Sequence, residues 1–225
     1  MTAESKSLYQ VILNFYRSLR DKYLYFRRYP YLKKIQSFLG NDTSIISSNC
    51  FAGRVMQDIG MEYNTPTLGL WFMPDDFPKF CSDLHYYLHC EIHEKEHSKN
   101  ELGEYKRTHR LKHPYPVGSL GGVEIHFLHY YSFDEAATKF RRRAERVNMN
   151  NILMIGFEQN GCTEKDIREF DQIPYEYKLF FCSKPYPYES VVFIKEFRKL
   201  GCVGDPYKKG HIYYKYLIKW LEKHY

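Results

Sequence analysis

One cysteine stands where a β-strand is expected to pass directly into a helix. Residues 47–53 read Ser-Ser-Asn-Cys-Phe-Ala-Gly, after a β-prone run and before a helix-compatible one. A thiol in the first turn of a helix lies near unpaired backbone N–H groups, which lower its pKa. Cys50 is therefore a candidate nucleophile, Asn49 a candidate oxyanion or ligand donor, and Gly53 a point of close approach for a ligand. The alternative is that Cys50 is a small apolar core residue.

Two histidines follow in a second β-prone run, residues 123–130, which reads Val-Glu-Ile-His-Phe-Leu-His-Tyr. Strand alternation would place Glu124, His126 and Tyr130 on one face and His129 on the other. His129 is expected at the carboxyl end of the strand, where it would serve a nearby thiol as general base, with His126 as the second choice. A purely structural role remains open for either histidine.

A cluster of basic residues lies on the helix expected over residues 133–147. Helical spacing places Lys139, Arg142, Arg143 and Arg146 on one side, which would suit the phosphates of a ligand. A solvated helix face is the alternative. The sequence contains neither a P-loop nor a GxGxxG motif, so a common nucleotide or dinucleotide site is not predicted.

The stretch His93-Glu94-Lys95-Glu96-His97 matches the HExxH motif of zinc peptidases in its letters. In those enzymes the motif lies on a buried helix, whereas the residues around this copy are uniformly polar and supply no third ligand. We interpret it as a charged surface segment. No metal site is predicted.

The elements that must position these residues alternate between strands and helices, which predicts an α/β fold with a largely parallel sheet flanked by helices. Ligands of such sheets bind beyond the carboxyl ends of the strands, which indicates the turns at residues 49–50, 72–76 and 129–132. Residues 91–113 are expected to form a loop or a solvated hairpin. Strands are expected over 44–49, 67–72, 123–130, 151–157, 178–182 and 190–195, and helices over 51–59, 74–87, 133–147, 163–170 and 213–222.

The first forty residues differ from the rest, so we divide the chain into an amphipathic helical extension, residues 1–40, and a single α/β domain, residues 41–225. Apolar residues recur at helical spacing over residues 5–24, opposite a polar face. This helix is expected to pack on the domain. Because its far end is basic, peripheral contact with a membrane or contact with a partner is the alternative.

Composition limits the classes of function. The net charge of +6 and a pI near 8.8 favour anionic ligands or an anionic membrane surface, and are too small for a nucleic-acid-binding footprint. Six cysteines without a CxxC pair indicate reduced thiols. With no signal peptide or membrane span recognised, we expect a cytoplasmic protein, with the inner face of the membrane as a further possibility.

Several of these motifs together resemble an uncharacterised bacterial family labelled exopolysaccharide or capsular polysaccharide biosynthesis protein. The resemblance covers about residue 42 to the end. It rests on the segments 46–53, 64–72, 115–118, 126–130 and 139–157. It implies an α/β fold and a role in making or decorating surface polysaccharide.

The opening strand-Asn-Cys-helix pattern is also similar, more weakly, to that of coenzyme-A-binding capsule enzymes. This likeness suggests an acyltransferase that moves an acyl group from a coenzyme A thioester to a sugar hydroxyl. Cys50 would be nucleophile or thioester contact, Asn49 the oxyanion donor, and His129 or His126 the base. Phosphate contacts would come from Arg142 and Arg143, and substrate contacts from Asn64, Asp75 and Tyr130.

Two other classes stay open. The domain could be a non-catalytic module that binds a sugar or a lipid-linked intermediate, with Tyr and Trp rings as stacking platforms. A glycan hydrolase would need paired carboxylates in one cleft, for which Glu124 with Asp75 or Asp76 is the available pair. Replacing Cys50 by Ala would abolish turnover in the enzyme and leave a binding module intact.

Overall fold

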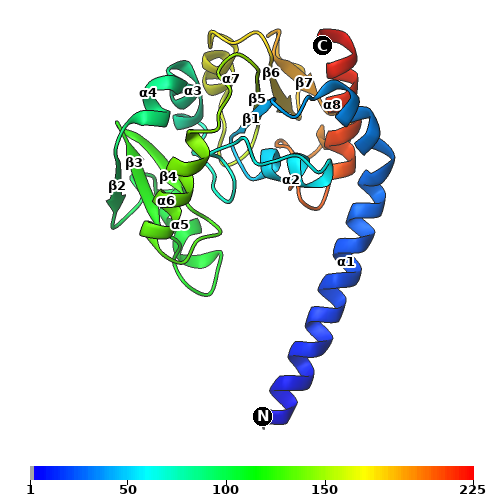
Figure 1. Cartoon of the computed structure of the whole chain (residues 1–225), viewed down its shortest axis with the longest axis vertical. Coiled ribbons are helices and arrows are strands. Elements are labelled where there is room, and N and C mark those ends of the chain that lie inside the picture. Colours follow the sequence, from blue (N-terminus) through cyan, green and yellow to red (C-terminus); the bar gives the residue numbers. More distant parts are fainter. Residues whose placement is uncertain (1–2) are drawn as a thin grey trace. The chain divides into compact units, whose positions relative to one another are not determined.

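The computed structural model describes residues 3–225, with the side chains of residue 8 and of residues 10–225 (Figure 1). The chain divides into two compact units. One unit combines the segment up to Phe38 with Asp205–Tyr225, and the other is Leu39–Gly204.

A four-stranded sheet forms the centre of the unit Leu39–Gly204. Its strand order is β1-β5-β6-β7, and every neighbouring pair is parallel. All six residues of β5 are buried, the pattern of a central parallel strand that is covered on both faces. The predicted parallel α/β fold is confirmed. The strands are β1 Ser44–Ser47, β5 Ile152–Phe157, β6 Lys178–Cys182 and β7 Val191–Phe193.

Helices flank this sheet, and local capping explains where several of them begin. The hydroxyl of Ser132 accepts the Glu135 N–H before α6, and Thr163 forms a reciprocal capping box with Asp166 before α7. The predicted helix over 74–87 is divided at Asp83 into α3 and α4. The bounds are α2 Phe51–Asp58, α3 Asp76–Ser82, α4 Leu84–His89, α6 Phe133–Ala144 and α7 Glu164–Asp171, with a short 3-10 turn, η1, at Lys195–Phe197.

A second, antiparallel sheet is the largest departure from the sequence prediction. It consists of β2 Ile92–Lys95, β3 Val117–Leu120 and β4 Val123–His126, in that order. The predicted strand over 123–130 therefore ends at His126, because the Leu128 N–H turns back onto the His126 carbonyl. Residues 91–113 form neither the expected loop nor a hairpin of their own. They contain β2, which pairs with β3, and the helix α5, Glu101–His109, capped by Asn100.

The predicted strand over 67–72 is reduced to one bridge, Trp71 to His126. The segment nevertheless lies between the turn after β1 and the turn after β4. The Phe72 N–H donates to Ser48 O on one side, and Gly69 O accepts the His129 N–H on the other. It connects the end of β1 with the turn after β4.

The other unit consists of two helices, α1 Ala3–Phe38 and α8 Gly210–His224, which contact each other. Helix α1 is longer than the predicted segment 5–24 and contains Pro30. On its buried side lie Leu24, Arg28, Leu32 and Ile35. Among the residues described, no helix is long and apolar enough to cross a bilayer.

Candidate functional site

The turn between β1 and α2 is closed by its own side chains. Asn49 Oδ1 accepts the Phe51 N–H at 3.0 Å, and Ser47 Oγ accepts the Ala52 N–H at 2.9 Å. Ser47 Oγ also donates to the Asn49 carbonyl at 2.5 Å. Two N–H groups of the first helical turn are thus paired inside the chain rather than directed at a ligand.

Cys50 is half-buried, and its Sγ donates to the Leu70 carbonyl at 3.5 Å. A hydrogen bond donated by a thiol stabilises its protonated form, so nucleophilic attack would require the thiol to leave Leu70. Gly53 has a packing role, because a Cβ at this position would lie 2.0 Å from Leu68 Cδ1. The glycine allows the segment around Leu68 to lie against α2.

A narrow crevice lies at the carboxyl ends of β1 and β5, where the sequence predicted ligand binding. Asn49 and Gln159 line it, and Asn49 Nδ2 donates to Gln159 Oε1 at 3.2 Å. Gln159 Nε2 in turn donates hydrogen bonds to the carbonyls of Val203 and Gly204. The crevice encloses about 10 Å³, which is room for about one water molecule. Its amides bind one another and leave little space for a ligand.

The two histidines have different surroundings. His126 is fully buried, stacked on Trp71 with ring centroids 4.1 Å apart, and its Nε2 lies 3.0 Å from Glu124 Oε1. His129 is exposed, and partial desolvation followed by the charge of Arg110 lowers its pKa from the usual value. The chain around Leu70, hydrogen-bonded to both sides, lies between the Cys50 turn and the strand that carries His126.

Other predicted contacts act within the fold. Tyr130 is buried and donates to Leu68 O at 2.9 Å, and the buried Arg143 donates to the Tyr130 hydroxyl at 2.6 Å. Arg142 is exposed, so the two arginines occupy different environments.

Two more predicted substrate residues are half-buried or exposed. Asn64 is bound through Nδ2 to the Asn41 carbonyl at 2.9 Å, which joins two loops. Asp75 is exposed, with Lys79 Nζ 3.5 Å from its carboxylate.

An ionic network surrounds the buried carboxylates of Asp76 and Glu124 beside the antiparallel sheet. These two residues are one of the carboxylate pairs considered above for a glycan hydrolase, and neither of them lines a cleft among the pockets described here. Asp76 is fully buried, accepts Lys99 Nζ at 2.7 Å, and accepts the Glu124 N–H at 3.1 Å. Burial raises the pKa of Asp76, against the opposing effect of Lys99. For Glu124, burial is outweighed by hydrogen bonds from His126, Ser98 and the Lys99 N–H, which lower its pKa. These pairings fix the loop before α5 to β4.

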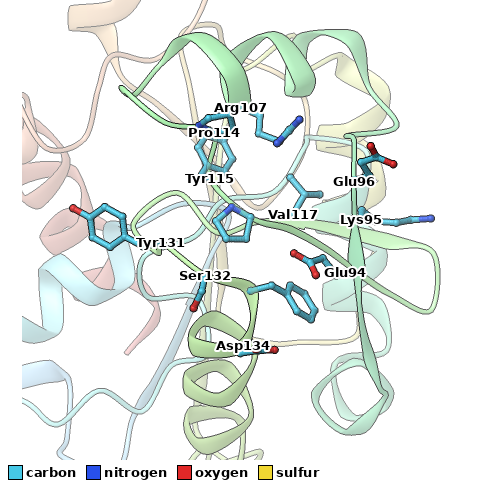
Figure 2. Close-up of a pocket in the computed structure, with 12 residues that line it drawn as sticks. Glu94, Lys95, Glu96, Arg107, Pro114, Tyr115, Val117, Tyr131, Ser132 and Asp134 are labelled. Atoms are coloured by element: carbon cyan, nitrogen blue, oxygen red, sulfur yellow. The ribbon is translucent and has the colours of Figure 1, made fainter.

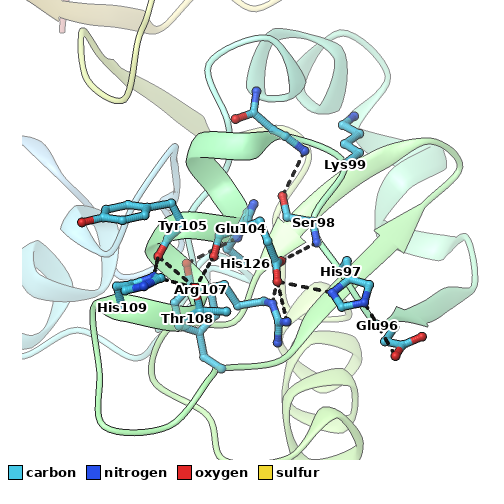
Figure 3. Close-up of polar contacts among 12 residues, drawn as sticks. Glu96, His97, Ser98, Lys99, Glu104, Tyr105, Arg107, Thr108, His109 and His126 are labelled. Atoms are coloured by element: carbon cyan, nitrogen blue, oxygen red, sulfur yellow. Dashed lines mark hydrogen bonds and ion pairs between the residues drawn. The ribbon is translucent and has the colours of Figure 1, made fainter.

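A second polar cluster orients Arg107 on α5, as Figure 3 shows. Arg107 Nε and Nη2 donate to the two carboxylate oxygens of Glu104 at 2.7 and 2.6 Å. Glu104 also accepts the Ser98 N–H at 2.8 Å and lies 3.3 Å from His97 Nδ1. The hydrogen bond from Arg107, with those from Ser98 and His97, lowers the pKa of Glu104 to about 2. Arg107 is therefore held by a two-point ion pair.

This oriented guanidinium lines a polar cleft of about 400 Å³ (Figure 2). The volume lies in the range of small-molecule pockets. Tyr131, at the rim, is 93% exposed, an unusual position for an aromatic ring. The charged and hydroxyl side chains of the cleft are those of Glu94, Lys95, Glu96, Arg107, Tyr115, Tyr131, Ser132 and Asp134.

The sequence predicts one part of this cleft, the turn at residues 129–132, but not the wall opposite, because the two walls meet only through the antiparallel sheet. Glu94 and Glu96 belong to the polar stretch that we interpreted as a charged surface segment. Tyr131 and Ser132 belong to the turn 129–132 at which ligand binding is predicted above, whereas Asp134 is not among the predicted site residues. The spacing of Glu94 and Glu96 is the signal that could have indicated this wall. They are two residues apart, so in a strand they would lie on the same side.

The structure thus defines the chain as a parallel α/β domain with a polar surface cleft beside an added antiparallel sheet. A family described as "Domain of unknown function (DUF1919)" matches residues 24–222, and the chain belongs to this family. A similar protein is an uncharacterised protein of Haemophilus influenzae (strain ATCC 51907 / DSM 11121 / KW20 / Rd). It is 33% identical over 185 residues, which cover 79% of this chain and 83% of that protein.

Proposed function

We propose that the chain is a carbohydrate-binding protein of surface-polysaccharide synthesis, and that the polar cleft is its sugar site. The observation that carries the proposal is the exposed ring of Tyr131 beside a cleft that carboxylates and a guanidinium line. Sugar hydroxyls both donate and accept hydrogen bonds, so they pair with carboxylates and with guanidinium groups. The C–H face of a sugar ring stacks on an aromatic ring that is open to solvent.

Preorganisation supports the same proposal. Arg107 is fixed by Glu104, and Glu94 extends from β2, so two of the polar groups come from regular elements. A side chain that is already held loses less conformational entropy when a ligand binds. This distinguishes the cleft from a chance grouping of mobile surface charges.

The link to polysaccharide synthesis rests on the motif resemblance given above, and a cytoplasmic location is part of the proposal. The cleft takes the place of the sheet edge as the expected position of the glycan. Its polar lining suits a hydrated, hydroxyl-rich ligand.

Saturation-transfer NMR and calorimetry with neutral and acidic mono- and disaccharides test the proposal. Replacing Tyr131 by Ala should weaken sugar binding about 10-fold, because a stacking contact is lost. Tyr105→Ala is the matched control, since Tyr105 is also an exposed tyrosine but does not line the cleft. Equal affinity in both variants would contradict the sugar site, as would the absence of binding by any saccharide.

Acyl transfer at Cys50 is a second candidate, favoured by the position of this thiol in the turn between the parallel strand β1 and the helix α2. The Cys50 thiolate would attack the carbonyl carbon of a coenzyme A thioester and release the coenzyme A thiolate. A sugar hydroxyl would then attack the acyl-cysteine and release Cys50, while His129 accepts the hydroxyl proton. Arg142 would contact the donor's phosphates.

Thermal unfolding with millimolar coenzyme A tests this second candidate. A bound ligand raises the free energy of unfolding in proportion to the logarithm of its concentration over Kd. We expect a higher Tm that Arg142→Ala reduces, and loss of acyl transfer in Cys50→Ala with an unchanged fold. No change of Tm, or full activity in Cys50→Ala, would contradict acyl transfer.

A further inference from the structure

Helix α1 carries apolar residues on two opposite sides. The side with Leu24, Arg28, Leu32 and Ile35 is buried, and Gly210 of α8 lies against the Arg28 side chain. At 100° per residue, a second apolar arc lies on the far side of the helix. All its members are exposed: Leu8, Val11, Ile12, Phe15, Tyr16, Leu19, Tyr23 and Phe26.

The contacts of α1 with the rest of its unit leave this arc uncovered. Asp21 and Arg20 contact the hydroxyl of Tyr207, on the side of the helix away from the arc. Exposed apolar patches of this length on a single helix mark interaction surfaces. The family match begins only at residue 24, so most of the arc precedes the part of the chain that defines the family.

The charge of this segment is the second observation. Residues 1–38 contain eight Lys and Arg and two acidic residues, a net charge of +6, which equals that of the whole chain. The net charge of residues 39–225 is therefore zero. The entire positive excess lies on the helix that carries the exposed apolar arc.

We propose that α1 binds the surface of an anionic bilayer, with the arc from Leu8 to Phe26 inserted among the lipid headgroups. An apolar arc with basic flanks is the pattern of helices that lie in the membrane interface. Tyr and Phe, which are frequent in the arc, favour the boundary between headgroups and acyl chains. Lys22 extends its ammonium from within the arc toward the headgroups.

A second copy of the chain fits the arc less well than a bilayer does. A two-helix coiled coil uses a narrow seam of two positions per heptad, whereas this arc spans about 140° of the helix circumference. Lys22 would fall in such a seam. A basic helix would also repel a parallel copy of itself.

The test is sedimentation of the full chain with vesicles of phosphatidylcholine, with and without about 30% phosphatidylglycerol. We expect binding to the anionic vesicles that decreases as salt is raised, because salt screens the attraction. The double variant Leu8→Glu/Leu19→Glu should bind at least about 10-fold more weakly, since it places two carboxylates in the arc.

The matched control is Leu111→Glu/Leu200→Glu, which makes the same change outside α1. Leu111 is 45% exposed against 47% for Leu19, and Leu200 is 63% exposed against 62% for Leu8. Circular dichroism checks that both variants fold. Equal binding by the two variants would overturn the proposal. So would failure of the parent chain to bind anionic vesicles, whether or not ultracentrifugation shows a dimer that Leu8→Glu/Leu19→Glu dissociates.

Discussion

Two regions of the unit Leu39–Gly204 carry polar groups near an opening, and they use those groups differently. At the edge of the parallel sheet, the amides of Asn49 and Gln159 bind each other and nearby backbone, around about 10 Å³ of space. Beside the antiparallel sheet, the carboxylates of Glu94 and Asp134 line about 400 Å³. The edge that topology favours for ligands is closed, and the added sheet supplies the open cleft.

The position of a site in the fold indicates where ligands bind in general. Whether a particular site can bind depends on whether its polar groups are already hydrogen-bonded within the chain. A capped helix terminus has already used its donors. In the cleft, Glu104 holds the Arg107 guanidinium, and the other polar side chains of the lining stay available to a ligand.

The largest effect should come from the ionic network around Asp76. Asp76→Ala leaves Lys99 without its buried carboxylate and the Glu124 N–H without its acceptor, and should cost about 3 kcal/mol of unfolding free energy. Asp75→Ala removes a neighbouring but exposed carboxylate and should cost less than about 0.5 kcal/mol. Urea denaturation of both variants measures the contrast. Similar losses would show that the buried contacts of Asp76 do not stabilise the domain more than the exposed ion pair of Asp75.

Gly53→Ala should destabilise the sheet edge by about 2 kcal/mol, because the added methyl group would overlap Leu68. The double variant Gly53→Ala/Leu68→Ala should recover part of this loss, which a double-mutant cycle would measure as coupling. A ligand role for Gly53 instead predicts normal stability with altered binding. Additive effects of the two substitutions would refute the packing role.

Asn49→Ala removes the side-chain acceptor of the Phe51 N–H in the first turn of α2 and should cost about 1 kcal/mol. Asn64→Ala removes one hydrogen bond between exposed loops and should cost about 0.5 kcal/mol. Sugar affinity should be unchanged in both variants, because neither side chain lines the cleft. A large loss of sugar affinity in Asn49→Ala would show that the ligand binds at the sheet edge rather than in the cleft.

The smallest effect concerns acid stability. The folded pKa of Glu104 is lowered to about 2 from 4.5, so the ion pair with Arg107 stabilises the fold above about pH 4.5 and loses this contribution as pH falls toward 2. Glu104→Gln should lack this pH-dependent stabilisation. At neutral pH its unfolding free energy should be lower than that of the parent chain by less than about 1 kcal/mol, because the pair is partly exposed. Denaturation series at pH 6 and pH 3 measure it. A constant difference between the proteins at both pH values would exclude Glu104 as the titrating group.

Much of the fold could be predicted because parallel strands leave a strong local signal. The continuous apolar run of β5 and the capping residues Ser132 and Thr163 are readable without any partner. The antiparallel sheet was missed because β2 has one buried residue in four, so its pattern is hidden among charges. Its pairing with β3 depends on contacts across more than twenty residues.

The candidate site was harder to predict than the fold. Asn49, Cys50 and Gly53 were identified by residue type, but type does not show that Leu68 and Leu70 already occupy their neighbourhood. The sequence does not show which of the adjacent carboxylates Asp75 and Asp76 is buried. The orientation of the helix on the domain decides this, and it buries Asp76. Such choices depend on tertiary packing.

The most direct test is an amide chemical-shift titration of the chain with the saccharide that binds most tightly. We expect shifts that saturate at Glu94, Glu96, Tyr131, Ser132 and Asp134, with the amides of Ser48, Asn49 and Cys50 unshifted. Saturating shifts at the three sheet-edge residues, with the cleft residues unshifted, would contradict a sugar site in the cleft.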